Sequence, residues 1–123
     1  MNPRVITLLC LALLIAWQLT WHAWLVPAGG LALLIWLLLA VLPLLMCAAA
    51  VLARRANGLF WSGVVALPYF CHGVMEAWAA AEPLRPWALI EALIAISLVL
   101  AVGIEGWQRR QAAKAQTKNA NPL

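Results

Sequence analysis

Long apolar runs, separated by short polar segments, divide this chain into four parts. The runs cover approximately residues 4–26, 31–53, 58–80 and 86–107. A helix needs about 20 mostly apolar residues to cross the hydrocarbon core of a bilayer. Each run reaches that length, so the pattern predicts an all-α fold with four transmembrane helices.

The connections between the runs are short. They are PAGG at 27–30, RRANG at 54–58 and AEPLRP at 81–86, and their proline and glycine residues favour turns. Short connections place helices that follow one another side by side and antiparallel. We therefore expect an up-down four-helix bundle over residues 1–108. The polar and basic tail over 109–123 is expected to be disordered.

Composition supports a membrane location. The 123 residues are 67% hydrophobic and 10% charged, with a mean hydropathy of +0.95. Soluble domains are nearer one half apolar and one quarter charged, and a soluble fold of this size could not bury so much apolar surface. The excess of basic residues does not indicate nucleic-acid binding, because these residues stand at the ends of apolar runs and in the tail. The bilayer is the expected surrounding.

The basic residues also predict an orientation. Seven of the eight fall on one side of the predicted bundle, and the eighth, Arg85, falls on the other. The seven are Arg4, Arg54, Arg55, Arg109, Arg110, Lys114 and Lys118. Lysine and arginine near span ends favour the cytoplasmic side, so both termini are expected in the cytoplasm.

The third run carries ionisable side chains within the stretch YFCHGVMEAW, residues 69–78. At 100° per residue, Tyr69, His72, Gly73 and Glu76 share about a third of the helix circumference. The glycine allows a neighbouring helix to approach closely. This run therefore has one polar face and one face suited to lipid.

Other polar residues are expected at the same depth. With neighbouring runs antiparallel, Gln18 and His22 of the first run, together with Arg85 and Glu91 at the start of the fourth, reach the outer half of the membrane. The candidate polar cluster is Gln18, His22, Tyr69, His72, Gly73, Glu76, Arg85 and Glu91. A charged carboxylate at mid-bilayer costs about 2.5–3.5 kcal/mol, so both glutamates should face the bundle, either paired or protonated. We expect His72 to pair with Glu76, and Arg85 to lie over either glutamate.

Three interpretations of the cluster remain open. It could be a set of interhelical hydrogen bonds, each worth about 0.6 kcal/mol on average. It could be a site for a proton, an ion or a ligand, since intramembrane carboxylates often serve such roles. It could also recognise a partner protein.

Catalytic signatures are missing from the sequence. There is no nucleophile with a base and an orienting group, no metal-ligand spacing and no phosphate-binding loop. The three cysteines are isolated from one another, which argues against a disulfide framework. We expect no enzyme activity, cofactor or metal. One alternative is haem binding, since His22 and His72 lie at one depth and two axial histidines can hold haem.

The chain resembles a known family through LPLL at 42–45, the pattern YFxxGV at 69–74, Arg85 and Glu91. It is similar to the small proteobacterial inner-membrane proteins grouped as domain of unknown function 2069, from the first run to Trp107. His72 and Glu76 are not among the matching residues. The resemblance implies a four-span protein of the bacterial inner membrane without an assigned activity.

Two functions are consistent with these features. The first is a structural or accessory membrane component that packs against a larger complex or a copy of itself. Short connections and the lack of a soluble domain favour it. The alternative is a small transporter or proton-coupled carrier that acts as an oligomer and uses the carboxylates of the cluster.

Overall fold

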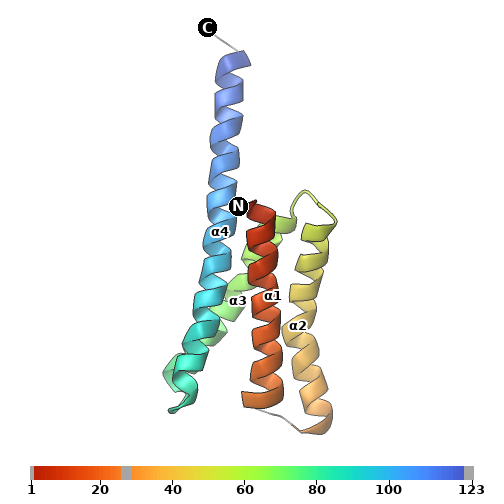
Figure 1. Ribbon diagram of the computed structural model, residues 1–123, viewed down its shortest axis with the longest axis vertical. Coiled ribbons are helices and arrows are strands. Elements are labelled where there is room, and N and C mark those ends of the chain that lie inside the picture. The colour runs from red at the N-terminus through yellow and green to blue at the C-terminus, as the bar shows by residue number, and fades with distance from the viewer. Residues whose placement is uncertain (1, 26–28, 121–123) are drawn as a thin grey trace.

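The fold consists of four long helices, as the apolar pattern predicts. The computed structural model describes residues 2–25 and 29–120. Its elements are α1 (Pro3–Thr20), the π-helix η1 (Trp21–Leu25), α2 (Gly30–Leu52), α3 (Gly58–Ala79) and α4 (Leu84–Ala120). All four α-helices are long and apolar enough to cross a membrane. Figure 1 shows them side by side along the long axis of the molecule.

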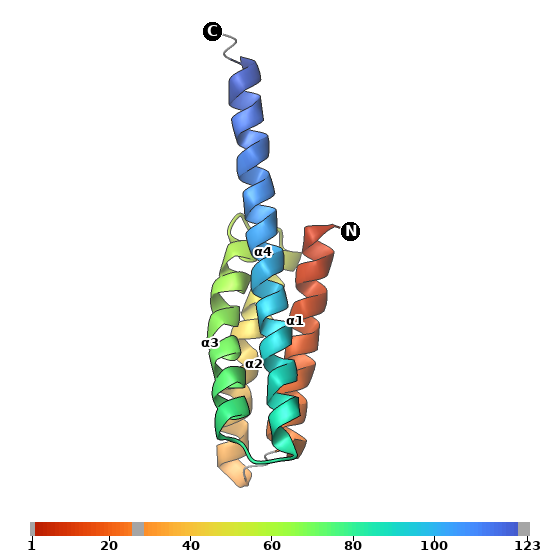
Figure 2. The same cartoon turned by 90° about the vertical axis from the view of Figure 1, so that its left-hand side faces the viewer.

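The chain connections lie at the two ends of this bundle. The N-terminal end of α1 and the connection from α2 to α3 are at one end, whereas α2 begins and α3 joins α4 at the other (Figures 1 and 2). The last part of α4 continues past the first of these ends, beyond the other helices (Figure 2). Everything else that the structure describes lies within the length of the bundle.

Local signals fix the start of α1 and tie it to α2. Asn2 is the N-cap and its side chain accepts a hydrogen bond from the backbone N–H of Arg4, with Pro3 in the first turn; both are favoured helix-start residues. The Arg4 guanidinium then donates to the carbonyl of Val51 at 3.2 Å. That carbonyl belongs to the last turn of α2, where a cation also meets the negative end of the helix dipole. Arg4 thus joins the two helices at one end of the bundle.

The buried face of α1 follows a heptad pattern. Its buried residues are Thr7, Leu11, Leu14, Gln18 and Trp21. The spacing alternates between four and three residues, which keeps one narrow stripe turned toward neighbouring helices. Leu11 and Leu14 of this stripe belong to an apolar layer and Gln18, one turn after Leu14, belongs to a polar layer, so the two layers are stacked along the bundle axis.

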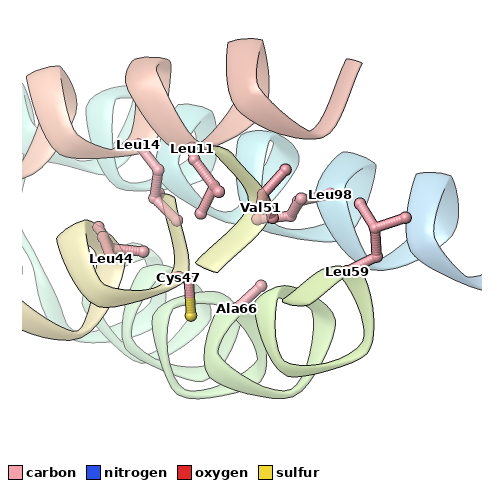
Figure 3. Packing of buried hydrophobic residues seen from close by; sticks show 8 residues of the cluster. All are labelled: Leu11, Leu14, Leu44, Cys47, Val51, Leu59, Ala66 and Leu98. Atoms are coloured by element: carbon pink, nitrogen blue, oxygen red, sulfur yellow. The ribbon is translucent and has the colours of Figure 1, made fainter. Parts of the chain in front are cut away.

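The apolar layer receives side chains from all four helices. Figure 3 shows its members converging: Leu11 and Leu14 from α1, Leu44, Cys47 and Val51 from α2, Leu59 and Ala66 from α3, and Leu98 from α4. Four of these leucines have no exposed surface. Because lipid is as apolar as this core, close packing rather than the hydrophobic effect stabilises the layer.

Small residues bring α3 and α4 together, and this helix pair has the most extensive contact in the bundle. The buried positions include Ser62, Gly63, Ala66 and Gly73 on α3, and Ala88, Ala92 and Ala95 on α4. A Cβ atom built on Gly73 would lie 2.7 Å from the backbone nitrogen of Ala92 and 3.0 Å from the carbonyl oxygen of Ala88. The two backbones therefore touch at Gly73, as small residues at membrane helix interfaces permit.

By contrast, α2 lies mostly on the outside. Only 11% of its most apolar window is buried, against 39% for α3. Bulky apolar side chains such as Leu31, Leu38 and Met46 are exposed. The most apolar helix thus presents the most surface for lipid, and the helix that carries the polar stretch is the most enclosed.

Two details differ from the sequence expectations. The tail expected to be disordered from residue 109 is helical as far as Ala120. Alanine, glutamine and lysine are strong helix formers, and a continuing helix avoids the cost of a new nucleus. The first span also ends in one turn of π-helix at Trp21–Leu25. The turn expected at 27–30 falls partly outside the described residues, of which Gly30 has a positive φ of 56°.

Candidate functional site: a polar layer between three helices

The centre of the candidate site is the carboxylate of Glu91. Glu91 has no exposed surface. Nε2 of Gln18 on α1 donates to its Oε1 at 2.6 Å, and Nδ1 of His72 on α3 lies 3.1 Å from both Oε1 and Oε2. We call Gln18, His72 and Glu91 the polar layer. It links α1, α3 and α4 through one carboxylate.

These contacts satisfy a group that is costly to bury. A buried carboxylate without hydrogen bonds is strongly unfavourable, and each oxygen of Glu91 has a partner in the chain. An amide nitrogen can only donate, so Oε1 accepts from Gln18. When Glu91 is ionised, the hydrogen between it and His72 is carried by Nδ1, and Nε2 is the free nitrogen of the ring.

Aromatic rings enclose His72. Trp21 meets it edge-on, with ring centroids 6.2 Å apart, and the ring of His22 is 6.4 Å away. Trp21 is only 2% exposed, so it packs inside the bundle. Trp24 and Trp78 are more than 80% exposed, as interfacial residues are.

Glu76 is placed differently from the expectation. Its Oε1 lies 4.0 Å from Nε2 of His72, which is too long for a hydrogen bond, and 40% of its side chain is exposed. The expected pairing of His72 with Glu76 is thus only a distant contact. The reason is that His72 directs Nδ1 across the helix interface toward Glu91. Glu91 is enclosed by the bundle, and Glu76 sits at its edge.

Arg85 does not lie over a glutamate. Its side chain is exposed, and its Nη2 donates only a long 3.5 Å hydrogen bond to the carbonyl of Ala80. Within residues 2–25 and 29–120, Arg85 forms no ion pair with Glu76 or Glu91. It stands in the first turn of α4, where a long cationic side chain extends toward the interface instead of into the bundle.

Tyr69 and Gly73 each contact a different neighbouring helix. The hydroxyl of Tyr69 donates a short hydrogen bond to the carbonyl of Ala40 on α2. Gly73 is packed on α4, next in sequence to His72. The polar face of α3 therefore reaches α2 through Tyr69, and it reaches α4 through both His72 and Gly73.

A cavity of about 470 Å³ adjoins the polar layer between α1, α2 and α3. Its lining is Gln18, His22, Trp36, Leu39, Ala40, Pro43, Val65, Pro68, Tyr69 and His72. The ring of His22 stacks nearly parallel to that of Trp36, at an interplanar angle of 6°. Four of the eight predicted cluster residues line this cavity, and two of the four, Gln18 and His72, also belong to the polar layer.

Sequence reasoning missed several participants. Trp21 is absent from the candidate polar cluster, and the carbonyl of Ala40 has no side-chain signature. The three-and-four spacing that joins Leu14, Gln18 and Trp21 was the available signal for burial of the tryptophan. The π-helical turn, a feature frequent at functional sites, had no signal that we could identify.

Metal binding has little support from the geometry. Within the described ranges, no three His, Cys, Asp or Glu side chains are grouped so that they could hold a metal ion. His22 and His72 lie together, as their common depth predicts. One ring nitrogen of His72 is engaged with Glu91, which leaves a single nitrogen for any ligand.

Comparison with known proteins gives one match. The model of the family described as "Predicted membrane protein (DUF2069)" matches residues 6–106. This segment covers most of the first span, all of the second and third, and the fourth as far as residue 106, and it includes every residue of the polar layer. No curated protein and no solved structure matches the chain.

Proposed function

The chain belongs to the DUF2069 family of predicted membrane proteins, and from this premise we propose that it is a multi-pass protein of the bacterial inner membrane. We propose an antiparallel, up-down bundle with both termini in the cytoplasm. The charge pattern supports this orientation, because all basic residues except Arg85 belong to one side. Cytoplasmic segments near span ends are enriched in lysine and arginine.

Reporter fusions test the orientation. Green fluorescent protein fluoresces when fused in the cytoplasm, and alkaline phosphatase is active only outside it. We expect fluorescence from fusions after Asn57 and after Leu123, and phosphatase activity from a fusion after Ala81. Phosphatase activity from the fusion after Leu123 would contradict the proposed orientation.

We propose further that the protein is a structural or accessory component of the membrane, without catalytic activity. The observation that carries this is the enclosure of Glu91, which has no exposed surface and whose hydrogen bonds go to Gln18 and His72 of the same chain. A carboxylate so enclosed is suited to holding neighbouring helices together through its hydrogen bonds. Interhelical hydrogen bonds of this kind stabilise membrane bundles by about 0.6 kcal/mol each on average.

An accessory role needs a surface for a partner. The exposed apolar side of α2 offers one within the membrane, and the described connections at residues 53–57 and 80–83 are too short to form a soluble domain. The proposed partner is therefore a membrane protein, either a larger complex or a second copy of this chain.

The mass of the native particle tests this role. The protein should be extracted from its own membrane with a polymer that retains neighbouring lipid, and weighed by native mass spectrometry. We expect a particle that contains either two or more copies or a stoichiometric second protein. A single copy with lipid alone would contradict the proposal.

One observation favours the alternative of proton-coupled transport. His72 contacts the enclosed Glu91 through Nδ1 and faces the half-exposed Glu76 through Nε2, at 4.0 Å. A histidine between two carboxylates is the arrangement of a proton relay. The alternative predicts that protein in liposomes carries protons when a membrane potential is imposed, and that Glu91→Gln abolishes the flux. Flux no greater than that of protein-free liposomes is the result expected from the accessory role.

A further inference from the structure

The cavity of about 470 Å³ between α1, α2 and α3 is not explained by a structural role. If the polar layer served only to hold the helices together, apolar side chains could enclose it on every side. Here Gln18 and His72 of that layer also line an opening at membrane depth. A cavity of this size accepts a ring-sized group, and apolar walls with a few converging polar groups are typical of ligand sites.

The lining indicates that the ligand is uncharged. None of the lining residues is a lysine, arginine, aspartate or glutamate. Arg85 is exposed elsewhere, and Glu91 lies behind Gln18 and His72. A phosphate or carboxylate head would meet no lysine or arginine in this lining, and these are the residues that usually recognise such anions. A phospholipid head and an isoprenoid phosphate are therefore disfavoured.

The lining also indicates that the ligand carries polar atoms. Gln18, His22, Tyr69 and His72 bring amide, imidazole and hydroxyl groups to one cavity. The carbonyl of Leu39 adds an acceptor, because Pro43 stands four residues later and has no N–H to donate to it. Both Leu39 and Pro43 line the cavity. An alkyl chain alone would offer no partner to the imidazole of His22, which makes no hydrogen bond within the described residues, or to the carbonyl of Leu39, at a free-energy cost.

The aromatic lining and its hydrogen-bonding groups point to a flat ring that carries oxygen atoms. The rings of His22 and Trp36 are parallel to within 6° with centroids 6.4 Å apart, so two flat aromatic surfaces border the cavity. His72 is oriented by Glu91 through Nδ1, which leaves Nε2 as its free nitrogen. A quinone ring is neutral and planar, and carries two oxygens that accept hydrogen bonds when oxidised and donate them when reduced.

We propose that this cavity binds the ring of an isoprenoid quinone or quinol. Its ring lies against His22 and Trp36, its oxygens meet the polar residues of the lining, and its tail leaves toward the lipid. The site holds the ring without an electron-transfer step. The inference adds a ligand to the accessory role proposed above.

Titration calorimetry on protein in lipid nanodiscs tests the proposal. The probes are a benzoquinone and a naphthoquinone with the same decyl tail, and 1-decanol serves as the tail without the ring. We expect saturable binding of at least one quinone, with about one ring per chain, and no saturable binding of decanol beyond that of empty nanodiscs. Equal binding of decanol would assign the cavity to a lipid tail and overturn the proposal, as would the absence of saturable quinone binding.

Adjacent valines supply matched variants. Val65 lines the cavity, whereas Val64 lies on the exposed side of α3. Val65→Phe should fill the cavity and weaken quinone binding about tenfold or more, and Val64→Phe should change it by less than about twofold. Equal weakening by both variants would overturn the proposal.

A second variant tests the same site in case Val65→Phe does not fold. His22 makes no hydrogen bond within the described part of the chain, so His22→Leu removes a polar group without disturbing the polar layer. We expect weaker quinone binding, by about fivefold, as one hydrogen bond to the ring is lost. Unchanged quinone binding in His22→Leu would overturn the proposal that the ring lies against His22 and Trp36. A Soret absorption band on the purified protein would assign His22 and His72 to haem instead, and would also overturn the proposal.

Discussion

Nδ1 of His72 lies 3.1 Å from each carboxylate oxygen of Glu91. This contact joins α3 to α4 one residue away from Gly73, where the two backbones meet. Gln18 adds α1 through the same carboxylate. The polar layer and the close approach of the helices thus support one another, and the cavity adjoins the layer between α1, α2 and α3.

Glu91→Ala should destabilise the bundle strongly. The substitution leaves Gln18 and His72 without their partner, and a buried group left unsatisfied costs about 1–3 kcal/mol. We expect the free energy of unfolding, measured by sodium dodecyl sulfate titration in mixed micelles, to fall by about 2 kcal/mol. Glu76→Ala is the matched control and should change it by less than about 0.5 kcal/mol. Equal losses in both variants would contradict the placement of the two glutamates.

Gly73→Ala should push α3 and α4 apart. The added Cβ would lie 2.7 Å from a backbone atom of Ala92, and backbone cannot move aside as a flexible side chain can. Overpacking of this kind costs about 1–3 kcal/mol, so the melting temperature in detergent should fall.

Gly103→Ala is the control for this effect. A Cβ at Gly103 has nothing within 4 Å, and alanine is the better helix former by about 1 kcal/mol. The melting temperature of Gly103→Ala should therefore stay the same or rise. A fall equal to that of Gly73→Ala would mean that the helix contact at Gly73 is not tight.

Arg85→Ala should leave stability almost unchanged. The exposed guanidinium makes one long contact with a backbone carbonyl, and exposed interactions contribute little. We expect a change in the free energy of unfolding of less than about 0.5 kcal/mol, identical in the wild type and in a Glu91→Gln background. A larger change that disappears in that background would show that Arg85 pairs with Glu91.

Hydropathy was enough to predict the four helices, because crossing a bilayer demands long apolar runs. The cost of a carboxylate in the bilayer predicted that Glu91 faces the bundle, and the missing side chain of Gly73 predicted a close helix contact. These sequence features do not predict which polar side chains pair with one another. His72 lies 3.1 Å from Glu91 but 4.0 Å from Glu76 because of how α3 and α4 are rotated against each other. Small residues such as Ala88 and Ala92 set this rotation. The cavity depends on the spacing of three helices, which the pattern of one helix does not encode.

The end of α4 should be helical in solution. Residues 109–120 continue the last span and are exposed. Removing residues 109–123 should reduce the helical circular-dichroism signal in proportion to the helical residues removed, and the melting temperature should stay the same because the bundle ends before this segment. An unchanged signal would mean that the tail is disordered, as its composition first suggested.

The central claim is that hydrogen bonds to Glu91 hold the helices of the bundle together. A double-mutant cycle between Gln18 and Glu91 tests this claim most directly. Gln18→Leu, Glu91→Leu and the double variant should be compared by steric trapping in bicelles. We predict a coupling free energy of about 0.6–1.7 kcal/mol, the range found for interhelical hydrogen bonds in membranes. Additive losses, with coupling below about 0.3 kcal/mol, would contradict the account.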